Sequence, residues 1–398
     1  MSDRAEAVGG PILTTVTRWM LGIGVIGGIL MVWRFAVGLG RSTGLNDGYP
    51  WGLWISFDVV TGTALGCGGF AMALLVYIFN KGKYHPLVRP AILTSALGYS
   101  LEGLAIALDV GRPWFIFRIP LGGFPDMGKY NWNSSLLVVA LCVIAYIIVL
   151  WIELSPAFFE KWKDSPKQGL ANFSRKAYGF LEKALLWIIA LGVLLPAMHQ
   201  SSLGSVMLLS GPRLHSLWNT PFLPLLFLIS CITMGYAVVV MESALSSRVF
   251  DRPPHASMLA DIGKVAAYTV WIFLVIRLVD LVVRGRVGLM FKFDGYALMF
   301  WIEVVCFLVP AVMLMNNQKR QNLGYLFRAA MMLVLAGTLY RFDTYLVAFM
   351  PGENFSYFPT LPELFITFGI VAIEILLYVV LVKRFPILAG KPTTAAAH

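Results

Sequence analysis

Charged residues are scarce in this sequence. Asp, Glu, Lys and Arg make up 13% of its 398 residues, whereas 58% are hydrophobic. Soluble domains carry about a quarter charged residues, so this composition excludes a soluble fold and indicates that lipid surrounds much of the chain. The net charge of +10 would suit a nucleic-acid ligand in a soluble protein. Here Lys and Arg lie at the ends of apolar runs, where they indicate membrane orientation and no nucleic acid.

Cysteine and histidine are also few. The four cysteines lie inside apolar stretches and form no CxxC pair, so the sequence offers no ligand set for an iron–sulfur cluster. A membrane-bound b-type haem takes two axial histidines, and of the five histidines only His199 lies near a helix end at a suitable depth. We therefore expect no haem, no iron–sulfur cluster and no metal in this chain. The Walker A and HExxH motifs of soluble enzymes are missing as well, and no GxSxG motif lies between a strand and a helix.

Apolar runs dominate what is present. Ten of them reach about 20 residues, the length that spans a bilayer as a helix. They lie at 13–38, 52–79, 91–111, 133–155, 178–198, 221–246, 262–284, 296–316, 325–345 and 362–385. The connections between them are too short for a separate soluble domain. We predict an all-α polytopic membrane protein of about ten helices that forms a single integral membrane domain over residues 1–398.

The distribution of Lys and Arg predicts the orientation. They are about twice as numerous on the side that holds the N-terminus, the loops after even-numbered helices and the C-terminus. The positive-inside rule then places both termini in the cytoplasm. The loops after odd-numbered helices would face the periplasm, and they are richer in Gly, Pro and aromatic residues, as in 46–51 and 121–125. Such an irregular surface suits the docking of a partner.

Ionisable residues lie inside several predicted spans. A charge at this depth costs at least about 2.5–3.5 kcal/mol, so each needs a partner or a function. Most fall in the predicted periplasmic half or at its edge, namely Asp58, Glu102, Asp109, Arg112, His199, Arg277, Asp280, Glu303 and Arg341. Glu153 and Glu242 lie toward the cytoplasmic ends of their helices, and Glu374 lies mid-span. The pattern predicts a polar site that opens toward the periplasm.

Two of these groups are spaced to form ion pairs. Asp109 and Arg112 are three residues apart, as are Arg277 and Asp280, and residues at this spacing can pair along one helix face. Each pair is either a structural link between helices or part of a functional polar site, and the sequence leaves both interpretations open.

Several longer motifs resemble a known family. They are spread over nearly the whole chain: Asn46 to Gly69, Tyr84 to Pro90, Asp109 to Arg112, Met198 to Gly204, Phe300 to Glu303, Tyr357 to Thr360 and Ala372 to Glu374. These motifs resemble the integral membrane subunit of hydrogenase-2-type nickel–iron hydrogenases, within the NrfD / polysulfide reductase membrane-subunit family.

The resemblance implies an architecture and a role. It implies two pseudo-symmetric four-helix bundles, 52–198 and 221–345, flanked by a first helix at 13–38 and a tenth at 362–385. It also implies a bacterial or archaeal inner-membrane subunit that is not catalytic alone. Such a subunit exchanges electrons between a periplasmic ferredoxin-like iron–sulfur subunit, joined to a catalytic subunit, and menaquinone or ubiquinone.

Quinone reduction takes two electrons and two protons, so the headgroup needs hydrogen-bond partners and a proton source. We expect Asp58 and His199 to contact or protonate the headgroup, with Asp109, Arg112 and Gln200 as further quinone-binding residues.

A second set of residues is expected to carry protons. Glu102 and Glu242 would extend a path toward the cytoplasm, and Arg277, Asp280 and Glu303 are its further candidate members. Such a path would make the complex electrogenic.

Two alternatives remain open. The same module could serve a molybdopterin enzyme or a multihaem cytochrome, because the partner carries the distinguishing chemistry. A secondary transporter is the alternative from another class, and Gly- or Pro-broken helices at matching positions of the two halves would favour it.

Overall fold

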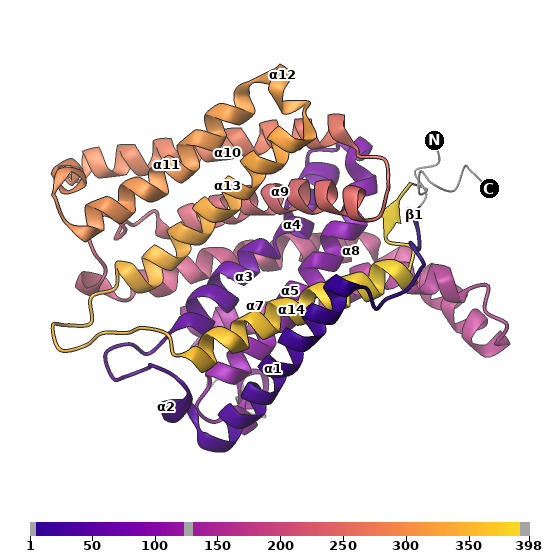
Figure 1. The fold of residues 1–398 in the computed structure, drawn as a ribbon, viewed down its shortest axis with the longest axis horizontal. Coiled ribbons are helices and arrows are strands. Elements are labelled where there is room, and N and C mark those ends of the chain that lie inside the picture. The colour runs from indigo at the N-terminus through magenta and orange to yellow at the C-terminus, as the bar shows by residue number, and fades with distance from the viewer. Residues whose placement is uncertain (1–4, 123–129, 391–398) are drawn as a thin grey trace.

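The computed structural model describes residues 5–122 and 130–390. Within these ranges, ten helices are long and apolar enough to cross a membrane. The prediction of an all-α multi-pass membrane protein is therefore confirmed. The named strands of this part of the chain are only two residues long, β1 (Ala5–Glu6) and β2 (Leu388–Ala389), and they pair antiparallel, joining the two ends of the chain (Figure 1).

The first half contributes five spans. Its elements are α1 (Thr15–Val37), α2 (Leu39–Ser42), η1 (Trp54–Val59), α3 (Val60–Leu65), α4 (Gly68–Ala73), η2 (Leu74–Ile78), η3 (Gly82–Leu87), α5 (Val88–Asp109), η4 (Pro113–Phe115), α6 (Arg118–Leu121), α7 (Ser135–Trp162), α8 (Gln168–Leu208) and η6 (Gly211–Arg213). The second span, Trp54–Ile78, is assembled from four short pieces. It breaks between α3 and α4, where Gly66 and Cys67 leave the helical conformation.

The second half contributes the other five spans. Its elements are α9 (Leu223–Val249), α10 (Ala256–Val283), η7 (Val287–Phe291), α11 (Gly295–Met315), α12 (Asn317–Arg320), α13 (Leu323–Phe342), η8 (Asp343–Val347) and α14 (Leu361–Arg384). Side-chain caps fix several helix starts. Asp294 caps α11, Asn322 caps α13, and Thr360 and Glu363 form a reciprocal capping box at the start of α14, which satisfies amide groups that the first turn leaves unpaired.

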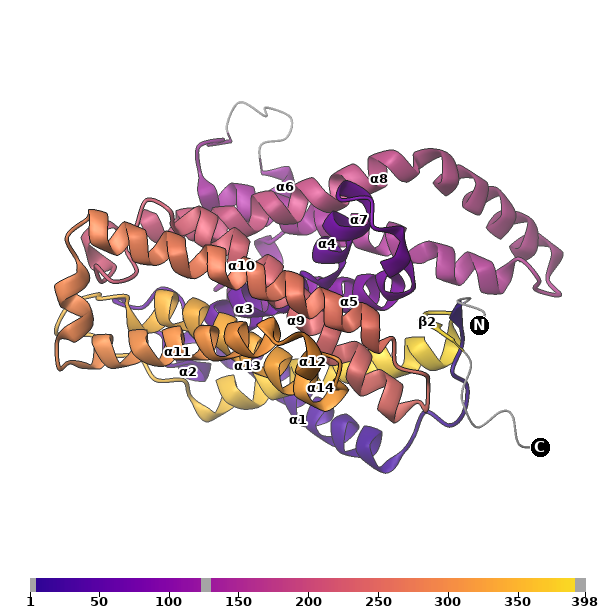
Figure 2. The ribbon, with the colours of Figure 1, turned by 90° about the horizontal axis from the view of Figure 1, so that it is seen from above.

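The helices pack in three groups. The hairpin of α7 and α8 packs with α5 and α4, and α9, α10, α11 and α13 pack together. The two groups meet where α9 lies against α3, α4 and α8. The third group is the pair α1 and α14, which run side by side along one flank and contact α5 (Figures 1 and 2). The core therefore lies where the broken second span meets α5 and α9.

Two spans depart most from their predicted limits. The third span begins at Gly82 instead of 91, and α8 covers 41 residues instead of 178–198. At 1.5 Å per residue α8 is about 60 Å long, twice the thickness of the hydrocarbon layer, so one end extends beyond the bilayer. The prediction began these spans shortly after Arg89 and Lys176. Lys, Arg and Glu are good helix formers, however, so they end the apolar run without ending the helix.

Two glycines set the distance between α1 and α14. A Cβ atom at Gly27 would lie 2.6 Å from the Cα atom of Gly369, and a Cβ atom at Gly369 would lie 2.7 Å from Cα of Gly27. Small residues at such crossings let membrane helices approach closely. The neighbouring Gly28 has open space around its Cβ position, so it serves as a matched control.

We expect Gly27→Val to lower the stability of the protein by about 1–3 kcal/mol, because the added methyl groups force α1 away from α14. Gly28→Val introduces the same residue into the same helix and should have little effect. Thermal unfolding of the detergent-solubilised protein measures both variants. Equal melting temperatures for the two would contradict the close crossing.

Candidate functional site

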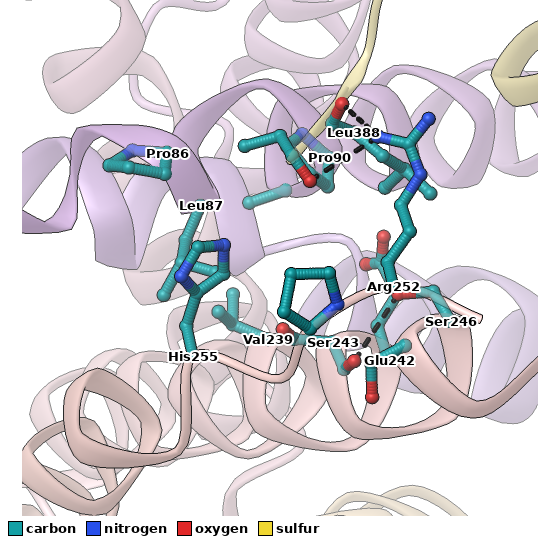
Figure 3. Close-up of a pocket in the computed structure, with 14 residues that line it drawn as sticks. Pro86, Leu87, Pro90, Val239, Glu242, Ser243, Ser246, Arg252, His255 and Leu388 are labelled. Atoms are coloured by element: carbon teal, nitrogen blue, oxygen red, sulfur yellow. Dashed lines mark hydrogen bonds between the residues drawn. The ribbon is translucent and has the colours of Figure 1, made fainter. Parts of the chain in front are cut away.

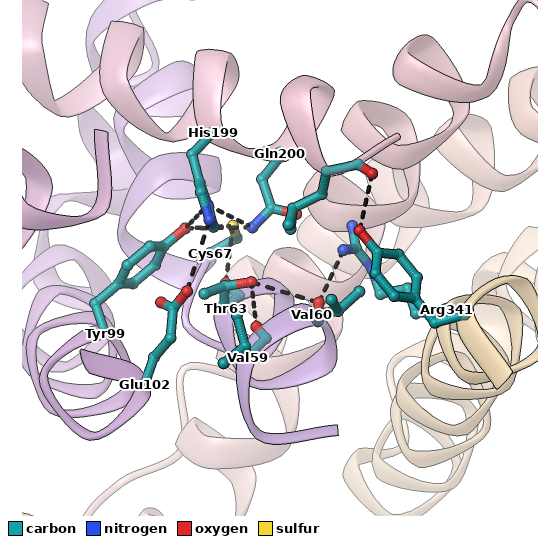
Figure 4. Close-up of polar contacts among 11 residues, drawn as sticks. Val59, Val60, Thr63, Cys67, Tyr99, Glu102, His199, Gln200 and Arg341 are labelled. Atoms are coloured by element: carbon teal, nitrogen blue, oxygen red, sulfur yellow. Dashed lines mark hydrogen bonds and ion pairs between the residues drawn. The ribbon is translucent and has the colours of Figure 1, made fainter. Parts of the chain in front are cut away.

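A cluster of polar side chains is buried between the helices of the first half. His199 and Gln200 come from α8, Tyr99 and Glu102 from α5, and Cys67 from the break between α3 and α4 (Figure 4). Tyr99 and Glu102 share one face of α5 because they are three residues apart. All five side chains are essentially inaccessible from outside. We call this group the His199 cluster.

The contacts within the cluster are loose. Gln200 donates from Nε2 to the hydroxyl of Tyr99 at 3.3 Å, and the Tyr99 hydroxyl lies 3.5 Å from Nδ1 of His199. Nε2 of His199 and Oε1 of Glu102 are 3.6 Å apart, which is too long for a hydrogen bond. The sulfur of Cys67 lies 3.7 Å from the Tyr99 hydroxyl.

Several atoms of the cluster have no hydrogen-bond partner among the described residues. They are both carboxyl oxygens of Glu102, Nε2 of His199 and Oε1 of Gln200. An unpaired buried polar atom costs about 1–3 kcal/mol. A structural network would satisfy these atoms, so their arrangement points to a functional role.

Arg341 of α13 places a positive charge beside the cluster. Its side chain is buried and donates to the carbonyl oxygen of Val60 at 2.9 Å (Figure 4). It also donates to the carbonyl oxygen of Phe227 at 2.9 Å and to the hydroxyl of Ser230 at 3.2 Å. These acceptors are neutral, so they leave the positive charge uncompensated. Arg341 lies within electrostatic range of His199, and a negative charge that develops in the cluster would be stabilised by it.

The predicted quinone-binding residues lie in three places. His199 and Gln200 belong to the cluster, and their role in quinone binding stays a prediction. Asp58 lies in η1 and accepts a hydrogen bond at 2.7 Å from Thr367 of α14. Asp109 lies at the end of α5, within electrostatic range of Arg34 of α1. Each of these carboxyl groups therefore has an interhelical neighbour that no local sequence pattern could indicate.

The predicted pairing of Asp109 with Arg112 is wrong. The helix α5 ends at Asp109, and the next residue, Val110, is extended, so the spacing of three residues no longer places the two side chains on one face. Arg112 is exposed, which places it outside the buried cluster. The buried arginine at this end of α5 is Arg34, whose guanidinium donates to the Val110 carbonyl at 2.9 Å.

The predicted pairing of Arg277 with Asp280 is also wrong. Arg277 forms a buried ion pair with Glu303 of α11, whereas Asp280 pairs with Arg284 one turn further along the chain. Glu303 also accepts a hydrogen bond at 3.1 Å from Nε1 of Trp218. The partner of Arg277 thus comes from a neighbouring helix and not from its own helix.

Aromatic rings surround this ion pair. The Arg277 guanidinium lies 4.6 Å from the ring centre of Phe300 and 5.1 Å from that of Tyr340. Nearby on η8, both carboxyl oxygens of Asp343 are buried without a hydrogen-bond partner among the described residues. Sequence reasoning overlooked Asp343, which lies two residues after Arg341 at the end of a predicted span.

Glu242, the predicted proton carrier nearest the termini, is held by two hydroxyl groups. Thr94 of α5 donates to its Oε2 at 2.6 Å, and Tyr378 of α14 donates to its Oε1 at 2.7 Å. Sequence reasoning missed both partners. The signal that could have found Tyr378 is its spacing of four residues from Glu374, which places both on one face of α14.

The motif around Tyr357 has a structural role at the other end of α14. The Tyr357 hydroxyl donates to Oε1 of Glu363 at 2.6 Å and accepts from the amide of Leu53 at 2.7 Å. Burial, followed by the neighbouring Glu363 carboxylate, raises the pKa of Tyr357. Glu363 also accepts from the amides of Gly44 and Thr360, each at 2.8 Å. These contacts join the 44–53 segment to the start of α14.

We expect Glu303→Gln to destabilise the protein by about 3–5 kcal/mol, because it leaves the Arg277 guanidinium buried without a counter-charge. The control is Asp261→Asn, which removes the exposed ion pair with Lys83 and should change stability by at most about 1 kcal/mol. Thermal unfolding in detergent compares the two variants. A Glu303→Gln protein as stable as the wild type would contradict the importance of this pair.

Comparison with known proteins places this architecture in a family. Residues 41–349 match the family model described as "Polysulphide reductase, NrfD". The chain is 41% identical to the "Probable Ni/Fe-hydrogenase 2 b-type cytochrome subunit" of Escherichia coli (strain K12), and the match covers 98% of this chain and 96% of the relative.

Two further relatives belong to other complexes. The chain is 28% identical to the "Menaquinone reductase, integral membrane subunit" of Nitratidesulfovibrio vulgaris, over 82% of this chain and 80% of the relative. It is 21% identical to the "Hdr-like menaquinol oxidoreductase integral membrane subunit" of Archaeoglobus fulgidus, over 87% of each chain.

The name of the E. coli relative overturns the expectation of a chain without haem, because a b-type cytochrome is a haem protein. That expectation rested on the scarcity of histidines at suitable depth. The described histidines do not fit a haem held between two of them. His199 is enclosed by the cluster, His215 stacks on Tyr296 with ring centres 4.3 Å apart, and His85 and His255 line different cavities. His398 lies outside the described residues.

The expectations on iron–sulfur and metal ligands concern absences and stay predictions. The family itself is shown by two independent findings, the model match over most of the chain and a relative at 41% identity over nearly its full length. This ten-span membrane protein therefore belongs to the NrfD family.

Proposed function

We propose that this chain is the quinone-reactive membrane subunit of a respiratory oxidoreductase complex. It would pass electrons between an iron–sulfur partner, attached to a catalytic subunit, and menaquinone or ubiquinone. Two relatives support this proposal, because their names describe the integral membrane subunits of a menaquinone reductase and of a menaquinol oxidoreductase. The proposal includes a location in the inner membrane with both termini in the cytoplasm.

The observation that carries the proposal is the His199 cluster. A quinone headgroup has two carbonyl oxygens that need hydrogen-bond donors and, on reduction, protons. The cluster supplies donors in the hydroxyl of Tyr99, the amide of Gln200 and the imidazole of His199, and it supplies a carboxyl group in Glu102. Ligand sites of this kind combine apolar walls with a few convergent polar groups.

Each group of the cluster has a separate task in this mechanism. The Tyr99 hydroxyl and the Gln200 amide would orient a carbonyl oxygen of the headgroup. Nε2 of His199 and Oε1 of Glu102, 3.6 Å apart, are close enough to exchange a proton after a small movement or through one water molecule. The fixed charge of Arg341 would stabilise the negative charge that develops when electrons arrive before protons.

The remaining predicted residues keep their roles as proposals. Asp58 lies in η1, and Asp109 lies at the end of α5, seven residues beyond Glu102 on the same helix face. They would guide the headgroup or its protons. Arg112 would take part only at the surface. Arg277, Asp280 and Glu303 would act as proton carriers within the second half.

The partner would dock on the loops at the opposite end from the termini. One of these loops is held rigidly: Trp51 donates from Nε1 to the carbonyl of Tyr345 at 2.9 Å, and Asn46 donates to the carbonyl of Ser356 at 2.9 Å. The ring of Phe358 beside it is 82% exposed. A fixed surface with exposed aromatic groups suits a protein interface.

The type of partner is the open alternative. The relatives come from hydrogenase, menaquinone reductase and menaquinol oxidoreductase complexes, so the same module could also serve a molybdopterin or multihaem partner. A secondary transporter has weaker support. The second span is broken, but α9, its counterpart in the second half, runs without a break from Leu223 to Val249, so the matching interruption that a transporter would have does not occur there.

We expect His199→Ala and Glu102→Gln to slow electron transfer to quinone at least about 100-fold in the complete complex, as the loss of a general acid or base does. The complex is purified with its partners, and the reduction of a menaquinone analogue is followed together with tryptophan fluorescence quenching, which reports binding. Electron transfer from the partner to a water-soluble dye should stay unchanged, because it bypasses the membrane subunit.

The matched control is Thr233→Val. Thr233 is buried, and its hydroxyl donates a hydrogen bond to Thr269 between α9 and α10, away from the cluster. Removing this hydroxyl should leave quinone reduction unchanged. Wild-type rates of quinone reduction in a folded Glu102→Gln and His199→Ala complex would rule out the cluster as the reactive site. A wild-type complex that binds no quinone would rule out the function itself.

A further inference from the structure

We propose that Glu374 connects a cavity near the chain termini to the His199 cluster, so that protons for the quinone reaction enter along one face of α5. The inference rests on the proposed quinone reaction and adds to it Glu374, the carboxyl group that would join the expected proton carriers Glu242 and Glu102. The route has four parts: a cavity, Glu242, Glu374 and Glu102.

The entrance is a cavity between the start of α5 and the end of α9. Glu242, Ser243 and Ser246 of α9 line one wall, and Arg252 and His255 of the following loop line another (Figure 3). The strand β2 closes the cavity on the side where both termini lie. Its volume of about 30 Å³ exceeds the 10–15 Å³ that a water molecule needs. Its polar wall would keep such water hydrogen-bonded.

Glu242 stands at the inner wall of this cavity. Its carboxyl group accepts hydrogen bonds from Thr94 of α5 and Tyr378 of α14. A carboxyl group that touches both a polar cavity and two helix interfaces can take up a proton on one side and release it on the other. The next carboxyl group inward is Glu374, which lies within electrostatic range of Glu242.

Glu374 reaches the face of α5 at a glycine. A Cβ atom at Gly98 would lie 3.6 Å from Oε1 of Glu374 and 3.6 Å from the Cα atom of Gly66 in the second span. The absence of a side chain at Gly98 therefore leaves the space between the two helices to the Glu374 carboxyl group.

The spacing of residues on α5 completes the connection. Thr94, Gly98 and Glu102 follow one another at intervals of four residues, so they lie on one face of the helix. They meet Glu242, Glu374 and His199 in that order. At 1.5 Å per residue the distance along α5 from Thr94 to Glu102 is about 12 Å, which Glu374 divides into two shorter steps that water molecules can bridge.

A purely structural role fits Glu374 poorly. Glu242 and Asp58 each accept a hydrogen bond from a residue of α14, whereas Glu374 makes no hydrogen bond to any residue that the structure describes. A carboxyl group in a membrane span that makes no hydrogen bond lowers the stability of the protein, so we expect Glu374 to have a function.

The stoichiometry of the reaction fixes what the route must carry. Reduction of one quinone takes two electrons from the iron–sulfur partner and two protons, and forms one quinol. If the electrons enter from the loops opposite the termini and the protons enter through the Glu242 cavity, each turnover separates charge across the membrane. Quinol oxidation would run the same steps in reverse.

The test uses the complete complex reconstituted in vesicles that contain a menaquinone analogue and an entrapped pH dye. A membrane-impermeant electron donor drives only those complexes whose catalytic subunit faces outward, so their Glu242 cavity faces the lumen. For the wild type we expect the lumen to become more alkaline as quinone is reduced. For Glu374→Gln we expect the initial rate of this change to fall at least about tenfold, because the amide cannot pass on a proton.

Two further variants separate transport from folding. Glu374→Asp keeps a titratable group and should recover part of the rate, whereas Gly98→Val should block the passage while Glu374 is intact. Glu153→Gln, a change at a carboxyl group of α7 that lies outside this line, is the control and should behave as the wild type. Thermal unfolding checks that each variant is folded.

The outcomes distinguish the two proposals. A wild type that neither binds nor reduces quinone contradicts the proposed function. A wild type that reduces quinone while lumenal alkalinisation persists at the normal rate in folded Glu374→Gln contradicts the route alone. Proton uptake only from the outer side in the wild type also overturns the route.

Discussion

The cost of placing polar groups in lipid governs this structure. An ionisable side chain inside a bilayer must find a counter-charge or a hydrogen-bond partner, or must have a function that justifies its cost. The second half of the chain follows the first course, with Arg277 against Glu303 and Asp280 against Arg284. The helices α10 and α11 are thereby held in register by a contact that neither could make alone.

The first half of the chain behaves differently. Its buried polar groups meet in the His199 cluster, and several of their atoms have no hydrogen-bond partner among the described residues. A broken second span and glycines at the helix interfaces bring these groups together, and the cluster therefore depends on close backbone approach. The paired charges of the second half join helices, whereas the proposed reaction draws on the His199 cluster together with Arg341 of α13. This division explains how one chain can hold charges for two different purposes.

Membership of the NrfD family gives this division a context. Relatives that share most of the chain are named as subunits of a Ni/Fe-hydrogenase 2, of a menaquinone reductase and of a menaquinol oxidoreductase. A common membrane module with variable partners fits the proposal that the quinone chemistry resides in the membrane subunit and the substrate chemistry elsewhere. The name of the E. coli relative implies a haem. The described histidines do not fit a haem held between two of them.

The sequence by itself determined the membrane class, the ten spans and the approximate limits of each, because a run of about 20 apolar residues has few alternatives to a membrane helix. Composition also located most of the buried ionisable residues, since a charge inside an apolar run is visible without a structure. The motif around Met198 and Gly204 drew attention to His199 and Gln200, whose role in quinone binding stays a prediction. The positions of the helix ends were less certain, because charge ends an apolar run without ending a helix.

Only the tertiary structure decided which side chains meet. Local spacing suggested pairs within one helix, whereas Arg277 found its partner on α11 and Asp58 found Thr367 on α14. Glu102, Tyr99 and His199 come from two helices that are far apart in the sequence, and no periodicity relates them. The physical reason is that a side chain in lipid is stabilised by whichever polar group lies nearest in space. The packing of the helices decides which group that is.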